Sequence, residues 1–117
     1  MSEYLNHKQF DLEQLTQKFA KEIRDYIKEL PQSISNREYE QQIIRSSGSV
    51  AANYIEANEA LSKKDFAMRI KICRKEAKET ELWLNMLEGD KGSAKQGLLQ
   101  ECIELRKIFG SIVQKVQ

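Results

Sequence analysis

Basic side chains gather on one side of a helix predicted over residues 63–88. At about 100° per residue, six of them fall within an arc of roughly 120°. These residues, here called the basic stripe, are Lys63, Lys64, Lys71, Arg74, Lys75 and Lys78. Cations in such an arrangement can neutralise the phosphates of RNA or DNA, so the basic stripe predicts a nucleic-acid-binding surface. The alternative interpretation is an ordinary solvated helix face.

A set of polar side chains follows one side of the preceding predicted helix. Guanidinium, hydroxyl, amide and carboxylate groups recur there at helical spacing, in Arg45, Ser49, Asn53 and Glu56. Groups of these kinds can satisfy one another's hydrogen bonds when they are partly buried. We predict a polar network in which Asn53 and Glu56 are partly buried and bonded together with Arg45. The alternative is again a solvated face.

The sequence contains no residue pattern typical of a catalytic or metal site. The only histidine, His7, lies in a polar stretch without a positioned partner. Cys73 and Cys102 each occupy an apolar position of a helical pattern, which predicts two buried free thiols. A Glu-x-x-His pair and a glycine-rich phosphate loop are missing from the sequence. We therefore expect no enzymatic activity, no catalytic residue, no metal and no cofactor.

The helix over 63–88 has two apolar lines. The first is its core seam: Phe66, Ile70, Cys73, Ala77, Thr80, Leu84 and Leu87. The second, here called the outer apolar line, lies on a separate face and consists of Met68, Ile72, Trp83 and Met86. A bundle buries one stripe per helix, so the outer apolar line must pack under a neighbouring helix or contact another subunit. We favour a homo-oligomer interface, with Arg69 and Glu76 as ion-pairing residues at its edge, or simply as a solvated edge.

Apolar periodicity and helix-boundary residues predict four helices, at about residues 11–29, 36–58, 63–88 and 94–116. Ser35 with Glu38 has the capping-box pattern that starts a helix, and Ser62 with Asp65 repeats it. Gly89 tolerates positive φ where the third helix must stop. Short connections between long amphipathic helices favour an all-α, antiparallel up-down-up-down four-helix bundle. A chain of 117 residues fits one such domain, spanning 1–117.

The second predicted helix has more apolar surface than one stripe requires. A second seam is displaced by about 100° from the first and contains Gly48. Glycine costs helix stability of roughly 0.5–1 kcal/mol relative to alanine, so its presence predicts close approach of another helix backbone. A ligand groove is the alternative.

Overall charge places limits on the partners. The chain has 19 basic and 18 acidic side chains and a net charge of +1, so attraction to nucleic acid must come from local placement of charge. No apolar run is long enough to span a bilayer, and the N-terminus lacks the apolar core of a signal peptide. We expect a cytoplasmic protein with no membrane partner.

Parts of the second and third predicted helices resemble a known family. The matching stretches are residues 44–57 (IRSSGSVAANYIEA), 62–66 (SKKDF) and 75–84 (KEAKETELWL). They are similar to bacterial four-helix bundle proteins related to those encoded in intervening sequences of 23S rRNA genes. The family often has Asn-Ile-Ala-Glu-Gly where this chain has NYIEA at 53–57. The resemblance implies an up-down bundle that assembles as a ring-like homopentamer. It extends to accessory proteins of diversity-generating retroelements, which are cationic barrels that bind nucleic acid and a reverse transcriptase.

Two functions remain open from the sequence. In the first, an oligomeric non-enzymatic bundle binds RNA or DNA through the basic stripe, with low sequence specificity because aromatic residues for base stacking are not interleaved with the cations. In the second, the same bundle is a structural or protein–protein interaction module whose lysines are only solvated.

Overall fold

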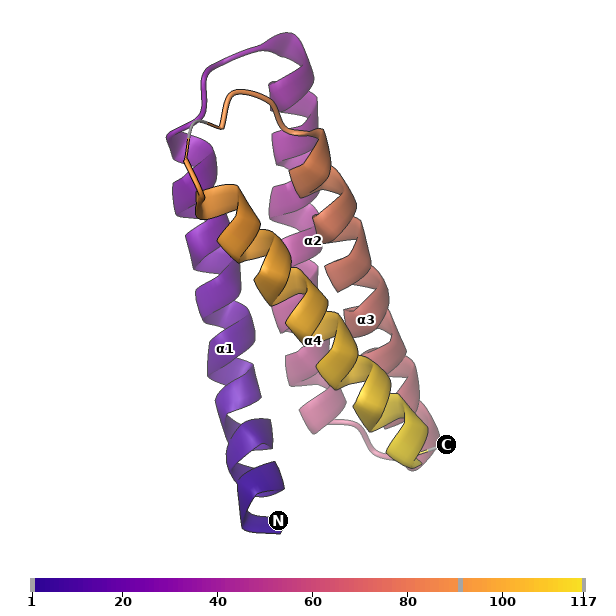
Figure 1. The fold of residues 1–117 in the computed structure, drawn as a ribbon. Helices are drawn as coiled ribbons and strands as arrows, with labels where there is room; N and C mark the ends of the chain where they lie inside the picture. Colours follow the sequence, from indigo (N-terminus) through magenta and orange to yellow (C-terminus); the bar gives the residue numbers. More distant parts are fainter. Residues whose placement is uncertain (1, 91, 117) are drawn as a thin grey trace.

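A computed structural model describes residues 2–90 and 92–116, with side chains from Leu12 onward. Its four helices are α1 (Ser2–Lys28), α2 (Ile34–Asn58), α3 (Lys63–Met86) and α4 (Ala94–Val116), and the described residues form no strand. Consecutive helices run in opposite directions, which brings both ends of the chain to one end of the molecule (Figure 1). The predicted all-α four-helix bundle is therefore confirmed.

The starts of two helices differ from those predicted. α1 begins at Ser2 rather than near residue 11. α2 begins at Ile34 because Ser33, and not Ser35, is its N-cap: the Ser33 hydroxyl accepts a hydrogen bond from the backbone N–H of Asn36 at 3.0 Å. The start predicted for α3 is confirmed, since Ser62 accepts from the backbone N–H of Asp65 at 3.0 Å. Each serine satisfies one of the amides that a helix leaves without a partner at its N-terminus.

The connections at one end of the bundle are fastened to each other. Gly89 has φ of +90°, as the sequence predicted, and a Cβ at this position would lie 2.5 Å from Cγ of Pro31. The buried side chain of Asn36 donates to the carbonyl of Glu88 at 2.9 Å and accepts from its N–H at 3.0 Å. The connection that follows α1 is thus held against the connection that follows α3, which fixes how the two helix pairs meet.

The helices do not contribute equally to the packing. α2 and α3 lie side by side along their length, and α1 packs mainly on α2. α4 runs diagonally, from beside the end of α1 to beside the beginning of α3 (Figure 1). One side of α3 therefore faces α2, another borders α4, and the arc between them is left to solvent.

The core contains aromatic, aliphatic and thiol side chains from all four helices. Phe19, Tyr54 and Phe109 are almost completely buried, and the rings of Tyr54 and Phe109 lie 6.2 Å apart. Cys73 and Cys102 are fully buried and free, so the prediction of two buried thiols is confirmed.

Within the described chain, no helix closely approaches Gly48, in contrast to one form of the prediction. A Cβ at this position would have no atom within 4 Å, so no other helix among the described residues packs against it. Ile44 and Ile55, on the same side of α2, are 48% and 40% exposed. Gly48 therefore lies on an open apolar strip of α2 rather than in a helix crossing.

Candidate nucleic-acid interface

The side of α3 that faces away from the core presents the basic stripe. All six of its cations are exposed. Within the residues that the structure describes, none of the six forms a salt bridge. They are therefore not held in ion pairs by the protein itself, and they can attract phosphates or other anions.

Residues of α4 line the edge of the basic stripe at two surface hollows. The first hollow, at the beginning of α3, is lined by Lys63, Lys64 and Lys71 together with Val116. The second is lined by Lys75 and Lys78 together with Arg106 and Glu81, among others. The stripe is thus part of a wider face formed by two helices.

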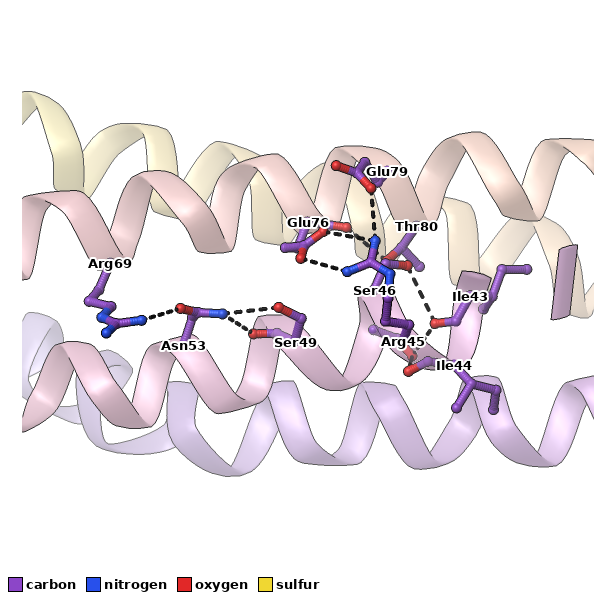
Figure 2. A network of polar contacts seen from close by, with 11 residues as sticks. Ile43, Ile44, Arg45, Ser46, Ser49, Asn53, Arg69, Glu76, Glu79 and Thr80 are labelled. Carbon is purple, nitrogen blue, oxygen red and sulfur yellow. Dashed lines mark hydrogen bonds and ion pairs between the residues drawn. The ribbon is translucent and has the colours of Figure 1, made fainter. Parts of the chain in front are cut away.

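The side of α3 that faces α2 holds paired charges instead (Figure 2). Arg45 donates to both carboxylate oxygens of Glu76, at 3.0 and 3.4 Å, and to Glu79 at 2.9 Å. The Glu76 side chain is only 7% exposed, whereas that of Arg45 is 51% exposed. A bidentate pair of this kind fixes the position of a guanidinium more firmly than a single contact does.

Two further sets of hydrogen bonds cross the same α2–α3 contact. The hydroxyls of Ser46 and Thr80 are fully buried and lie 2.7 Å apart. Asn53 donates to the carbonyl and the hydroxyl of Ser49, each at 3.0 Å, and accepts from Arg69 at 3.0 Å (Figure 2). We call this set, from Arg45–Glu76–Glu79 to Ser49–Asn53–Arg69, the α2–α3 polar network.

The network shifts the pKa of Glu76. Burial alone would raise the pKa of this carboxyl, but hydrogen bonds from Arg45 and Ser49 and the positive charge of Arg45 together lower it below its ordinary value. Glu76 therefore stays ionised, and the ion pair with Arg45 is maintained at neutral pH.

The membership of the network differs from the prediction. Arg45, Ser49 and Asn53 belong to it, but Glu56 is exposed and lies outside it, so the predicted partial burial of Glu56 is wrong. Arg69 and Glu76, predicted as ion-pairing residues at the edge of an oligomer interface, bond to α2 of the same chain. Glu79, Ser46 and Thr80 were missed. The spacing on α3 could have indicated two of them. Glu79 and Thr80 come three and four residues after Glu76, so they lie on the same side of the helix as Glu76.

The outer apolar line is only partly covered. Ile72 and Trp83 are half-buried, and Trp83 stacks on Tyr39 of α2 with ring centroids 6.0 Å apart. Met68 and Met86 remain 46% and 42% exposed. The line therefore both packs under α2 and leaves thioether surface open to solvent.

The described residues were predicted to contain neither a metal ligand set nor a reactive thiol. Among them no group of three metal-binding side chains occurs, and no helix is long and apolar enough to cross a membrane. Burial raises the pKa of both Cys73 and Cys102 to about 12, so neither is a reactive thiolate at neutral pH. The side chain of His7 lies outside the described residues.

Comparison with known proteins places the chain in a family. No curated protein matches it. The crystal structure of a protein of unknown function from the S23 ribosomal protein family of Bacteroides thetaiotaomicron superposes with a TM-score of 0.76 and 30% identity, over 86% of this chain and 96% of the other. The family sequence model described as 23S rRNA-intervening sequence protein matches residues 8–111. The chain therefore belongs to the 23S rRNA-intervening sequence protein family.

Proposed function

We propose that this protein is a cytoplasmic, oligomeric and non-enzymatic helical bundle that binds RNA or DNA through the basic stripe. The observation that supports it most directly is the exposure of all six cations without a salt bridge in the described chain. The α2–α3 contact shows that this protein pairs charges where they serve the fold. A row of cations without partners is therefore available for an external anion.

The proposed binding has low sequence specificity. The stripe offers ammonium and guanidinium groups to phosphates, and from Leu12 onward no described aromatic side chain is fully exposed for stacking on bases. The two buried free thiols fit the reducing environment of the cytoplasm.

Assembly is the second part of the proposal. Exposed Met68 and Met86 beside half-buried Trp83 form an apolar surface of the kind favoured at protein interfaces. We propose that this outer apolar line contacts a second copy of the chain in a closed homo-oligomer. The resemblance implies that this oligomer is a homopentamer. A ring would repeat the basic stripe and strengthen weak binding at each copy.

A charge-reversal experiment tests the nucleic-acid part. Changing Lys71, Lys75 and Lys78 to glutamate should lower both the affinity and its salt dependence, measured by fluorescence anisotropy with labelled RNA and DNA. For the unaltered protein, log K should fall linearly with log salt, with a slope near −0.9 per phosphate neutralised on duplex DNA. The matched control changes Lys18, Lys21 and Lys28 of α1 to glutamate, which alters the net charge equally on another helix. No binding by the unaltered protein at low salt, or equal losses in both triple variants, would favour the protein-interaction module instead.

A second experiment tests assembly. Light scattering should give the mass of a closed oligomer, and Trp83→Glu should dissociate it because the contact would bury an unpaired carboxylate. Asn85→Glu adds the same charge at an exposed position nearby on α3 and should leave the oligomer intact. A monomeric unaltered protein at micromolar concentration would refute this part.

A further inference from the structure

The basic stripe continues across the surface onto α4. Arg74 reaches toward that helix at Gly110: a Cβ on Gly110 would lie 3.8 Å from Cδ and 4.0 Å from a terminal nitrogen of Arg74. These are ordinary van der Waals distances, so the arginine side chain lies against α4 at this position. The guanidinium of Arg74 is therefore carried from the α3 row toward the α4 surface.

Two cations of α4 flank this crossing. Arg106 and Lys107 precede Gly110 by four and three residues, so they are its neighbours on the helix surface. Lys107 is exposed and forms no salt bridge within the described residues. Arg106 shares its surface hollow with Lys75 and Lys78. Together these residues give α4 a second, shorter row of positive charge beside the stripe.

One acidic side chain lies between the rows. Glu81 of α3 is 3.7 Å from Arg106, its side chain is 25% exposed, and its Oε1 accepts no hydrogen bond in the described structure. An ion pair at this distance is loose, yet the carboxylate offsets the charge of Arg106 where the two rows meet. Glu81 therefore reduces the positive potential at the centre of the face.

We propose that this α3–α4 face binds a nucleic-acid duplex, with the basic stripe on the phosphates of one strand and Arg106 and Lys107 on those of the other. Cations of both helices share one surface hollow, and a duplex offers two lines of phosphates on either side of a groove. A single strand has one line of phosphates and would engage one row. This inference rests on the proposed function and names its ligand class.

The test compares a duplex of two helical turns with each of its separate strands, in DNA and in RNA, by fluorescence anisotropy at low salt. The duplex should bind more tightly than either strand. Lys107→Glu should lower duplex affinity by at least about threefold and reduce the salt slope by about one or more, as expected for losing a phosphate contact. Glu81→Gln, which keeps the shape and removes the charge, should raise duplex affinity by about twofold or more through the freed charge of Arg106.

The control is Lys21→Glu, which makes the same charge change at an exposed position of α1. The inference is overturned if Lys107→Glu has no greater effect than Lys21→Glu, if Glu81→Gln does not bind more tightly, or if duplex and strands bind equally. Should the triple reversal on α3 still abolish binding in that case, the proposed function stands and only the α4 row and the duplex fail. Light scattering on each variant confirms that the assembly is unchanged.

Discussion

The two sides of α3 use charge in opposite ways. Toward α2, Glu76 is buried and held by Arg45, and Arg69 bonds to Asn53. Away from α2, the six cations of the basic stripe are exposed and form no salt bridge in the described chain. Buried charges are paired because burying an unpaired charge strongly destabilises the folded state. Exposed cations hardly affect the stability of the fold, so they are available to bind a partner.

The difference makes a prediction for every charged residue of α3. Substitutions facing α2 should change stability and leave nucleic-acid binding nearly unaffected. Substitutions in the basic stripe should change binding and leave stability nearly unaffected. The predictions below test this separation in order of decreasing effect on the free energy of unfolding.

Glu76→Gln should lower the free energy of unfolding more than the other substitutions. It removes the carboxylate that accepts two hydrogen bonds from Arg45, for an expected loss of about 1–3 kcal/mol at pH 7. The loss is smaller than for a fully buried ion pair because Arg45 is half-exposed and partly screened by water. Urea unfolding of the two proteins measures it. Glu79→Gln is the matched control, since Glu79 also bonds to Arg45 but is 38% exposed.

The same variant should change the response to acid. The pKa of Glu76 is lower in the folded chain than its ordinary value of 4.5, so the stabilisation is fully present above about pH 4.5. It is lost as the pH falls below 4.5 and through the folded-state pKa, because the unfolded chain takes up the proton first. Glu76→Gln should therefore lose less stability than the unaltered protein over this range. Parallel acid dependence of the two proteins would show that the Arg45–Glu76 pair does not stabilise the fold.

Asn53→Ala should have an intermediate effect. The substitution removes the oxygen that accepts from Arg69 and the amide that donates to Ser49. All of these groups are partly accessible to water, so we expect the free energy of unfolding to fall by about 1 kcal/mol. Glu56→Ala is the control, because Glu56 lies one turn further along α2 and is exposed outside the network. Thermal melts in which both variants lose the same stability would mean that the α2–α3 polar network adds nothing beyond an ordinary helix surface.

The sequence predicts the fold better than it predicts the network. Apolar periodicity located the core seam of α3 from Ile70 to Leu84, since burial of one helix face requires residues at spacings of three and four. It could not place the start of α2, because Ser33 and Ser35 are both capping residues and only the contact with Asn36 decides between them. A helical pattern identifies which residues share a face of a helix. It does not identify which neighbouring helix packs against that face.

The assignment of Arg69 and Glu76 shows this limit most clearly. They share one face of α3, which suggested an ion-pairing edge, but the partners of that face depend on how α2 rotates about its own axis. In the fold, Arg45 and Asn53 of α2 occupy that position, and Glu56 is exposed outside the network. The basic stripe raised no such problem, because a face without a neighbour in the bundle can be recognised from the sequence of α3 alone. Its continuation to α4 required the structure, since Gly110 and Arg74 are brought together only by packing.

The smallest effect on stability is expected for Lys78→Ala. Lys78 lies in the middle of the exposed face of α3. Lys78 forms no hydrogen bond or salt bridge in the described chain, and alanine has a slightly better helix propensity than lysine, so the free energy of unfolding should stay the same or rise slightly. Nucleic-acid binding should nevertheless weaken, with the slope of log K against log salt reduced by about one if Lys78 neutralises one phosphate. Urea unfolding and salt titration of the same preparation measure both quantities. A loss of stability as large as that of Asn53→Ala, with the salt slope unchanged, would show that the outer side of α3 also serves the fold and would remove the distinction between its two sides.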